Sequence, residues 1–347
     1  MLSSFNKIAL AFICFTLIAC EQDLPVFVYQ PTYITLDIPS DLPTPNLPKN
    51  NPLTEEGVAL GKKLFHDPIL SGDNTQSCAD CHLQANGFSD PNRFSEGVTG
   101  ALGDKNASSI INAAWNTSHF WDGRAESLEK QALGPVTNPI EMNSDSWNQV
   151  IEELKSTKEY PPLFQAAFNT FNFDSTHVAM AIAQFERTLI SSNSKFDKIS
   201  RLEMAYTPSE WRGREIFTTE KGDCFHCHSA PLFTDNDFHN NGLDEDENLK
   251  EGRASVTGEQ WDKGKFKTPT LRNIELTAPY MHDGRFSSLE EVVEHYNSGG
   301  KESSTLDPLM KNEGIGLGLT SQEKEDLVNF LKTLTDTAFI NNITFRP

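Results

Sequence analysis

Two stretches of the chain, CADCH at residues 78–82 and CFHCH at residues 224–228, share the pattern Cys-x-x-Cys-His. The sequence before them repeats as well, because GKKLF at 61–65 precedes the first stretch and GREIF at 213–217 precedes the second. Repetition of several landmarks in one order indicates a duplicated structural unit. We therefore expect two half-chains, each folded around one Cys-x-x-Cys-His stretch.

The repeat continues downstream of both stretches. In each half an asparagine comes ten residues before an Asp-Gly-Arg sequence, which is followed by Ser-Leu-Glu. The residues are Asn112, 122–124 and 127–129 in the first half, and Asn273, 283–285 and 288–290 in the second. The matched order predicts two domains related by internal duplication, at 53–200 and 201–347, with a boundary near 195–207.

The Cys-x-x-Cys-His pattern is typical of covalent haem attachment. Its two thiols form thioethers to the haem vinyl groups, and the histidine that follows ligates the iron. The chain has six cysteines, and four of them form these stretches: Cys78, Cys81, Cys224 and Cys227. A zinc site or a redox cysteine pair is the alternative, but two copies that use every cysteine after residue 20 favour haem. We expect two haem c groups with His82 and His228 as proximal iron ligands, and His226 at the surface.

The N-terminus has the features of an export signal. Residues 8–18 form an apolar run too short to span a bilayer, and the Leu-Ile-Ala-Cys that follows resembles a bacterial lipobox. We expect a lipoprotein signal peptide at 1–19, a lipid anchor on Cys20 and a proline-rich extended tether at 20–52. Ordinary secretory cleavage is the alternative. A lipidated Cys20 predicts a periplasm-facing protein on a bacterial membrane. The outer membrane is favoured, because the next residue is not the aspartate associated with inner-membrane retention.

Composition and helical patterns narrow the class of protein. The net charge of -20 argues against nucleic acid as a partner. Thr54-Glu55-Glu56 predicts the start of a helix, and the apolar residues between 319 and 334 follow helical spacing after an N-cap at Thr320 or Ser321. Because strand signals are few, we expect a mainly α fold.

Longer phrases of the sequence resemble the bacterial di-haem cytochrome c peroxidase family, which includes the MauG-type enzymes. These phrases are FWDGR at 120–124, GPV at 134–136, Glu-Met at 141–142, TPTLRN at 268–273 and APYMHDG at 278–284. The resemblance runs from about residue 53 to residue 334. It implies two cytochrome-c-like domains, in which the N-terminal haem binds peroxide and the C-terminal haem receives electrons.

The resemblance also implies roles for individual residues. Glu141 matches the distal acid-base carboxylate, and Gln131 and Pro135 match other positions of the distal pocket. A carboxylate over an open haem face can take a proton from one peroxide oxygen and deliver it to the other. Trp121 matches the aromatic residue between the two haems. Without the resemblance, Trp121 would be interpreted as a core aromatic and Glu141 as a surface charge.

A calcium ion and several partners are implied in the same way. Asn106, Thr277 and Pro279 match the protein ligands of a calcium ion that bridges the domains. Carbonyl oxygens suit such a hard cation. The implied partners are hydrogen peroxide and a c-type cytochrome or cupredoxin that donates electrons. Family members are often dimers, so a homodimer stays open.

Two positions depart from the reductively activated members of the family. Those members close the N-terminal haem with a histidine, where this chain has Val98, which cannot ligate iron. In the C-terminal half, Tyr296 stands where those members have methionine and the MauG-type enzymes have tyrosine. The same offset in the first half falls on Pro135. We therefore expect one open iron and one capped by Tyr296, with three rival ligands: Met281, Met310 and His295.

Three functional hypotheses follow. The first is a di-haem peroxidase that reduces hydrogen peroxide with electrons from a small redox protein such as cytochrome c. The second keeps the haem chemistry but oxidises aromatic residues of a partner protein, as the MauG-type enzymes do. The third is an electron-transfer cytochrome without a catalytic site, which requires both irons to be six-coordinate.

Overall fold

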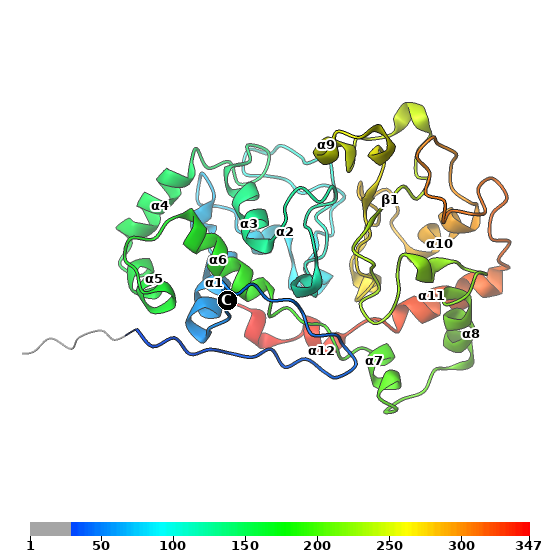
Figure 1. The fold of residues 1–347 in the computed structure, drawn as a ribbon, viewed down its shortest axis with the longest axis horizontal. Helices are drawn as coiled ribbons and strands as arrows, with labels where there is room; N and C mark the ends of the chain where they lie inside the picture. The colour runs from blue at the N-terminus through cyan, green and yellow to red at the C-terminus, as the bar shows by residue number, and fades with distance from the viewer. Residues whose placement is uncertain (1–28) are drawn as a thin grey trace, which may run out of the picture.

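The computed structural model describes residues 29–347, which form two lobes lying side by side (Figure 1). The predicted signal peptide at 1–19 and the predicted lipid anchor on Cys20 lie outside these residues. The mainly α class is confirmed. The described strands, β1 (Phe238–His239) and β2 (Phe266–Lys267), form one short antiparallel pair. No helix within residues 29–347 is both long and apolar enough to cross a membrane.

The helices divide between the lobes in chain order, apart from the last one (Figure 1). The first lobe contains α1 (Glu55–His66), α2 (Cys78–Cys81), α3 (Leu128–Thr137), α4 (Trp147–Ser156), α5 (Tyr160–Phe168) and α6 (Ser175–Glu186). The second lobe contains α7 (Lys195–Ser200), α8 (Pro208–Phe217), α9 (Ala254–Thr257), α10 (Leu289–Asn297) and α11 (Ser321–Lys332). The short α12 (Thr337–Ile340) follows α11 back toward the first lobe.

The two helix starts predicted from the sequence are confirmed. The hydroxyl of Thr54 accepts the backbone N–H of Gly57 at 3.0 Å at the start of α1. At the start of α11, Thr320 and Glu323 form a reciprocal capping box. Both caps satisfy backbone N–H groups that have no partner inside the helix.

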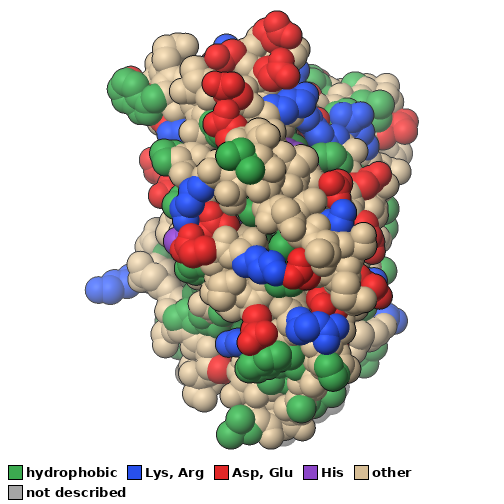
Figure 2. Space-filling view, turned by 90° about the vertical axis from the view of Figure 1, so that its right-hand side faces the viewer, with side chains coloured by type: hydrophobic (Ala, Val, Ile, Leu, Met, Phe, Trp, Pro, Cys, Tyr) green, Lys and Arg blue, Asp and Glu red, His purple; other side chains and the backbone are tan. Residues whose placement is uncertain are grey.

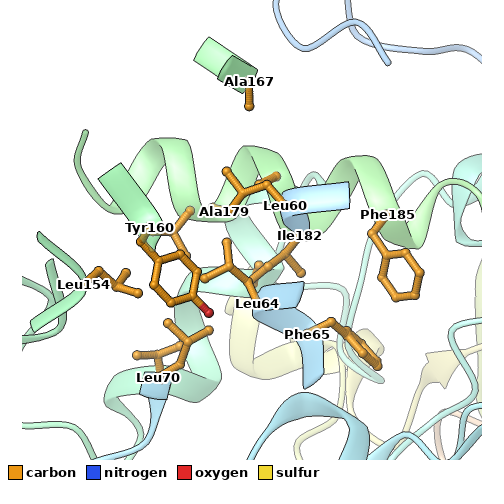
Figure 3. Packing of buried hydrophobic residues seen from close by; sticks show 14 of the residues in the cluster. Leu60, Leu64, Phe65, Leu70, Leu154, Tyr160, Ala167, Ala179, Ile182 and Phe185 are labelled. Atoms are coloured by element: carbon orange, nitrogen blue, oxygen red, sulfur yellow. The ribbon is translucent and has the colours of Figure 1, made fainter. Parts of the chain in front are cut away.

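Each lobe is built on a close helix crossing at one of the repeated glycines. A Cβ on Gly61 of α1 would lie 1.8 Å from the carbonyl oxygen of Ala181 in α6. A Cβ on Gly213 of α8 would likewise lie 1.9 Å from the carbonyl oxygen of Asp326 in α11. Only glycine lets two backbones approach this closely. The first crossing packs side chains of α1 against side chains of α6 (Figure 3): Leu60, Leu64 and Phe65 against Ala179, Ile182 and Phe185.

The hydrophobic cores of the two lobes are not formed strictly by the two halves of the chain, because C-terminal residues pack in the first core. Phe339 of α12 and Phe345 pack in the first core against Phe88, with ring centroids 5.6 and 6.1 Å apart. Phe196 of α7 packs against the second core. The C-terminal residues therefore connect the two lobes, and the predicted domain boundary near 195–207 stays a prediction.

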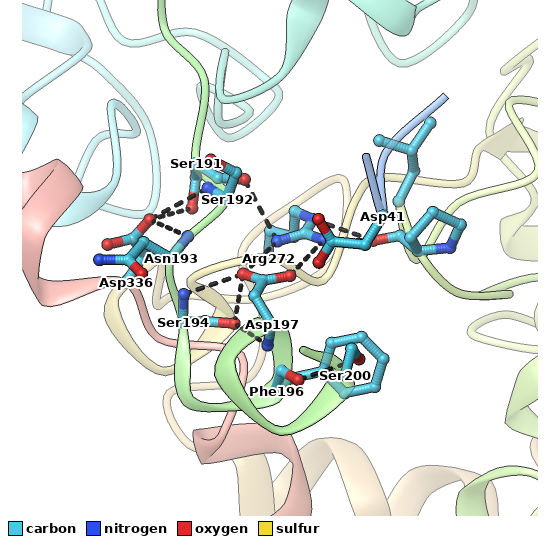
Figure 4. Close-up of polar contacts among 12 residues, drawn as sticks. Asp41, Ser191, Ser192, Asn193, Ser194, Phe196, Asp197, Ser200, Arg272 and Asp336 are labelled. Atoms are coloured by element: carbon cyan, nitrogen blue, oxygen red, sulfur yellow. Dashed lines mark hydrogen bonds and ion pairs between the residues drawn. The ribbon is translucent and has the colours of Figure 1, made fainter. Parts of the chain in front are cut away.

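Buried polar contacts hold the segment between the lobes (Figure 4). Arg272 and Asp197 form a two-bonded ion pair, with both N–O distances 2.9 Å and both residues 1% exposed. Asp336 accepts the backbone N–H groups of Ser192 and Asn193 at 3.0 and 2.8 Å. These contacts fix the position of one lobe relative to the other.

Residues 29–52 contain no helix and run along the body of the protein (Figure 1). Leu42 is buried, and the indole N–H of Trp115 donates to the carbonyl oxygen of Pro43 at 2.8 Å. Asp41 pairs with Arg201 at 3.2 Å. From residue 29 onward, the segment expected to be an extended tether is therefore extended and packed against the folded body.

The outer face of the second lobe carries charges of both signs (Figure 2). Acidic and basic side chains alternate over this face, and hydrophobic side chains lie between them in small groups. The net charge of -20 is therefore not expressed there as a uniformly acidic surface.

Candidate functional site

The first Cys-x-x-Cys-His stretch is shaped by the short helix α2. Asp80 accepts the backbone N–H and the hydroxyl of Ser77, both at 2.7 Å, and this capping box starts the helix. One helical turn then joins Cys78 and Cys81, and both are free thiols. His82 follows, and its Nδ1 lies 3.0 Å from the carbonyl oxygen of Phe88. Because a carbonyl only accepts, Nδ1 carries the hydrogen and Nε2 keeps its lone pair for a metal.

The second stretch repeats this arrangement. His228 Nδ1 lies 3.0 Å from the carbonyl oxygen of Phe233, and Cys224 and Cys227 are free thiols. Phe88 and Phe233, the two acceptors, both have left-handed backbones, with φ of 55° and 56°. Strained positions of this kind are often found at functional sites. Both histidines are thus oriented in the same way for a metal bound at Nε2.

A cavity of about 380 Å³ adjoins the first stretch. His82 and the two thiols line it together with Gln131 and Pro135 of α3 and with Glu141. Val98 is absent from its lining, and its backbone N–H donates to the carbonyl oxygen of Glu141 at 3.0 Å. The predicted distal residues and the predicted proximal histidine therefore share one cavity.

Glu141 has the environment of a group that exchanges protons. Burial raises the pKa of its carboxyl above the ordinary value, although Asn138 and the nearby Arg124 oppose the rise. Asn138 Nδ2 donates to Glu141 Oε1 at 2.7 Å and so holds the carboxyl in place. A raised pKa moves the titration of a carboxyl toward neutral pH, which is the direction that suits an acid-base residue.

A second cavity, of about 210 Å³, adjoins His228. Tyr296 of α10 lines it, as do two of its rivals, Met281 and Met310. The carboxamide of Asn241 contacts both Tyr296 Oη, at 3.0 Å, and Met281 Sδ, at 3.4 Å. The third rival, His295, does not line the cavity, because its Nε2 is directed to the carbonyl oxygen of Asn241 at 3.0 Å.

Trp121 lines both cavities. Its indole N–H donates to the carbonyl oxygen of Asn106 at 2.8 Å, and its ring lies edge-on to that of His282, with centroids 6.5 Å apart. Only a few residues form this shared wall, and Trp121 is the aromatic residue among them. The side chain predicted to lie between two haems therefore lies between the two cavities.

Three residues of these walls were not predicted from the sequence. Lys267 lines both cavities, and burial lowers the pKa of its ammonium to about 8. His119 lines the first cavity, and burial lowers its pKa to about 4. Glu186 of α6 lines the first cavity as well. No local pattern marks any of them, although Lys267 directly precedes the TPTLRN phrase.

Of the three residues predicted to bind calcium, Asn106 contacts the shared wall, because its carbonyl oxygen accepts the indole N–H of Trp121. The backbone N–H of Asn106 donates to the carbonyl oxygen of His282 at 2.9 Å, three residues after Pro279. Asn106 Nδ2 donates to the carbonyl oxygen of Asn92 at 3.0 Å. Thr277 lies in the segment that leads to Pro279 and would contact a Cβ added at Gly87. Carbonyl and amide oxygens of this kind are suitable donors for a hard cation.

The donor set of both cavities fits haem c. Each cavity has two free thiols for thioether bonds and one histidine whose Nε2 is available for iron. Apolar side chains form a large part of the walls, among them Ile182 and Met142 in the first cavity and Leu289 and Val293 in the second. His226, by contrast, lies 3.0 Å from Asp223 and does not line the second cavity.

The chain is similar to known proteins over most of its length. A family model described as di-haem cytochrome c peroxidase matches residues 55–204. The methylamine utilization protein MauG of Methylorubrum extorquens is 42% identical over 83% of this chain and 80% of that protein. Cytochrome c peroxidase Ccp of Escherichia coli is 38% identical over 84% of this chain, which spans 61% of Ccp. The crystal structure of a MauG-like protein associated with microbial copper homeostasis is 36% identical. It matches 90% of this chain and 98% of its own, with a TM-score of 0.83.

Proposed function

Because this chain belongs to the di-haem cytochrome c peroxidase and MauG family, we propose that it reduces hydrogen peroxide with electrons from a small redox protein. The two haem c groups typical of the family would be held by Cys78, Cys81 and His82 and by Cys224, Cys227 and His228. The donor would be a c-type cytochrome or a cupredoxin.

The difference between the two cavities carries this proposal. α3 and α10 begin with the same Ser-Leu-Glu sequence, and the seventh residue after the leucine is Pro135 in one and Tyr296 in the other. Proline cannot ligate iron, whereas a phenol can. The first cavity is therefore suited to bind peroxide and the second to transfer electrons, and these matched helices also support an internal duplication.

Haem, when bound, supplies the electrons that cleave the O–O bond of peroxide. Glu141 accepts a proton from one peroxide oxygen and returns it to the other, which converts a poor leaving group into water. Asn138 keeps the Glu141 carboxyl in position through the 2.7 Å hydrogen bond. Gln131 offers a carboxamide beside the same cavity for orienting a small polar substrate.

Trp121 is the residue best placed to connect the two sites. It lines both cavities, and its indole is fixed by the hydrogen bond to Asn106. An indole held in a rigid wall can pass an electron with little reorganisation. The buried Arg272–Asp197 pair helps to keep Trp121 between the two sites, because it fixes the positions of the two lobes.

Steady-state turnover of the haem-loaded protein tests the peroxidase function. Peroxide-dependent oxidation of reduced cytochrome c is expected, and it should be lost when Glu141 is replaced by Gln. Negligible turnover in the wild type, together with a long-lived doubly oxidised state, would contradict the proposal.

That outcome would favour a second function, in which the protein oxidises aromatic residues of a partner protein. Tyr296, which lines the same cavity as His228, favours it, because a tyrosinate ligand would stabilise ferric iron and lower the haem potential. Val98, which replaces the histidine that closes the N-terminal haem in reductively activated members, does not line the first cavity. An iron in this cavity would therefore not need reduction to release such a ligand.

We also propose that calcium binds between the lobes at Asn106, Thr277 and Pro279, where it would stabilise the wall that contains Trp121. The expected consequence is that a chelator lowers the electron-transfer rate between the haems without removing either haem. We further propose that Cys20 carries a lipid anchor and that the protein faces the periplasm, and mass spectrometry of the mature N-terminus tests the anchor.

A further inference from the structure

Glu186 is a buried carboxyl of the first cavity that the mechanism above does not use. It is the last residue of α6, is 4% exposed and lines the same cavity as Glu141. Its Oε2 is fully buried and has no hydrogen-bond partner among the described residues. An unpaired buried polar group destabilises the folded protein, and one that is nevertheless retained often has a catalytic role.

The charged groups around Glu186 leave its carboxyl unpaired. Arg187, the next residue, pairs with Glu129 of α3, and its Nη2 donates to Glu129 Oε2 at 2.9 Å. Burial raises the pKa of Glu186 to about 8, with Arg187 opposing the rise and Glu129 adding to it. Cys78 is the other titratable group that faces it, from α2. Glu186 therefore carries a proton at neutral pH, inside a cavity wall.

Glu141 and Glu186 both line the first cavity. The charge of Glu141 acts on the Cys81 thiol, and the charge of Glu186 acts on the Cys78 thiol. These two cysteines are the first and last residues of α2. The lining of the haem-attachment cavity therefore includes two carboxyl groups, the half-buried Glu141 and the buried Glu186.

Reduction of one hydrogen peroxide to two waters consumes two electrons and two protons. The electrons come from the reduced redox protein, and Glu141 supplies no net proton because it only moves one between the peroxide oxygens. We propose that Glu186 is a second acid-base residue of the first cavity, which donates its carboxyl proton in each turnover. This inference rests on the proposed peroxidase function. In the step, the O–H bond of Glu186 breaks and an O–H bond of product water forms. The second proton of the turnover comes from solvent, which also reprotonates the Glu186 carboxylate.

The substitution Glu186→Gln in the haem-loaded protein tests this role by rapid mixing with peroxide. The peroxide reaction should slow about 10-fold at pH 7, because general acid catalysis contributes at least that much. The wild-type rate should fall above about pH 8, where Glu186 loses its proton, and this fall should be absent in Glu186→Gln. Glu186→Asp should restore the pH-dependent fall. Glu152→Gln, which changes a side chain that is 77% exposed, is the matched control and should leave the rate unchanged.

Infrared difference spectroscopy of the peroxide reaction gives a second readout. A protonated-carboxyl band should change in the wild type and in Glu152→Gln, and it should be lost in Glu186→Gln. If Glu186→Gln does not retain haem, the proposal is tested with Glu186→Asp and with the wild-type spectrum instead. A wild-type spectrum in which no protonated-carboxyl band changes overturns the proposal. Identical rates and pH profiles for Glu186→Gln and the wild type also overturn it. A wild type that does not consume peroxide refutes the proposed function, whereas an active enzyme unaffected by Glu186→Gln refutes only this inference.

Discussion

Replacing Gly61 with alanine should destabilise the first lobe, because the added methyl would meet backbone rather than a flexible side chain. Its Cβ would lie 1.8 Å from the carbonyl oxygen of Ala181 and 2.5 Å from the carbonyl carbon. Neither atom can rotate away, so α1 and α6 must move apart by more than 1 Å. Overpacking of this kind typically costs about 1–3 kcal/mol, whereas alanine in a helix gains only about 0.5–1 kcal/mol over glycine. Because the clash is with fixed backbone, we take the upper end of the cost, about 3 kcal/mol, and subtract the gain of about 1 kcal/mol, which leaves a net loss of about 2 kcal/mol.

Urea unfolding of the haem-loaded protein measures this loss, with Gly57→Ala as the matched control. Gly57 lies one turn earlier in α1, where a Cβ would meet the side chain of Gln184. That side chain can rotate away, although it then no longer accepts the hydrogen bond from the backbone N–H of Thr54. The loss for Gly57→Ala should therefore be smaller. Because α6 also positions Glu186 in the cavity wall, Gly61→Ala should lower haem content too. A Gly61→Ala protein as stable as the wild type would refute the close crossing.

Three further predictions concern charged residues. Arg272→Met should lower the free energy of unfolding by about 3–5 kcal/mol, because it leaves Asp197 buried without its partner; a loss below 1 kcal/mol in urea would contradict this. Burial alone would raise the pKa of Glu129, but hydrogen bonds from Arg187 and Asn51 lower it to about 2, below its ordinary 4.5. This stabilisation is complete above about pH 4.5 and is lost as the pH falls toward 2. Glu129→Gln should therefore lower the free energy of unfolding by about 1–2 kcal/mol at pH 7, after allowance for solvent screening, and should leave it unchanged near pH 2. Chemical denaturation at both pH values checks this, and an equal loss at both would count against it. Glu141→Gln should lower kcat/KM for peroxide at least about 100-fold with haem content unchanged, and a smaller effect in stopped-flow assays would exclude the acid-base role.

The sequence was sufficient to predict what depends on local pattern. The Cys-x-x-Cys-His stretches, the caps at Thr54 and Thr320 and the mainly α class all follow from short-range rules, and the structure bears out the caps and the class. The repeated glycines Gly61 and Gly213 were visible as landmarks, but their purpose was not. Only the packed structure shows that each one meets a carbonyl group of another helix.

Features that depend on long-range packing could not be predicted. Nothing in the local sequence indicates that Phe339 and Phe345 return to the first core, because any amphipathic tail would have the same pattern. Lys267 and Glu186 look like ordinary surface charges in the sequence, and their burial results from contacts between elements far apart in the chain. The resemblance placed Trp121 between two haems, whereas the residues alone would have placed it in the core.

Low-temperature EPR of the ferric, haem-loaded protein tests the central claim most directly, namely that the two haem sites are unequal. We expect two ferric haems, one high-spin at the His82 site, whose cavity Pro135 lines, and one low-spin at the His228 site with a tyrosinate-like axial field from Tyr296. Loss of that axial field in Tyr296→Phe, with the high-spin signal unchanged, would assign the second signal. Two low-spin signals at neutral pH, with no high-spin component, would contradict the account and indicate an electron-transfer cytochrome.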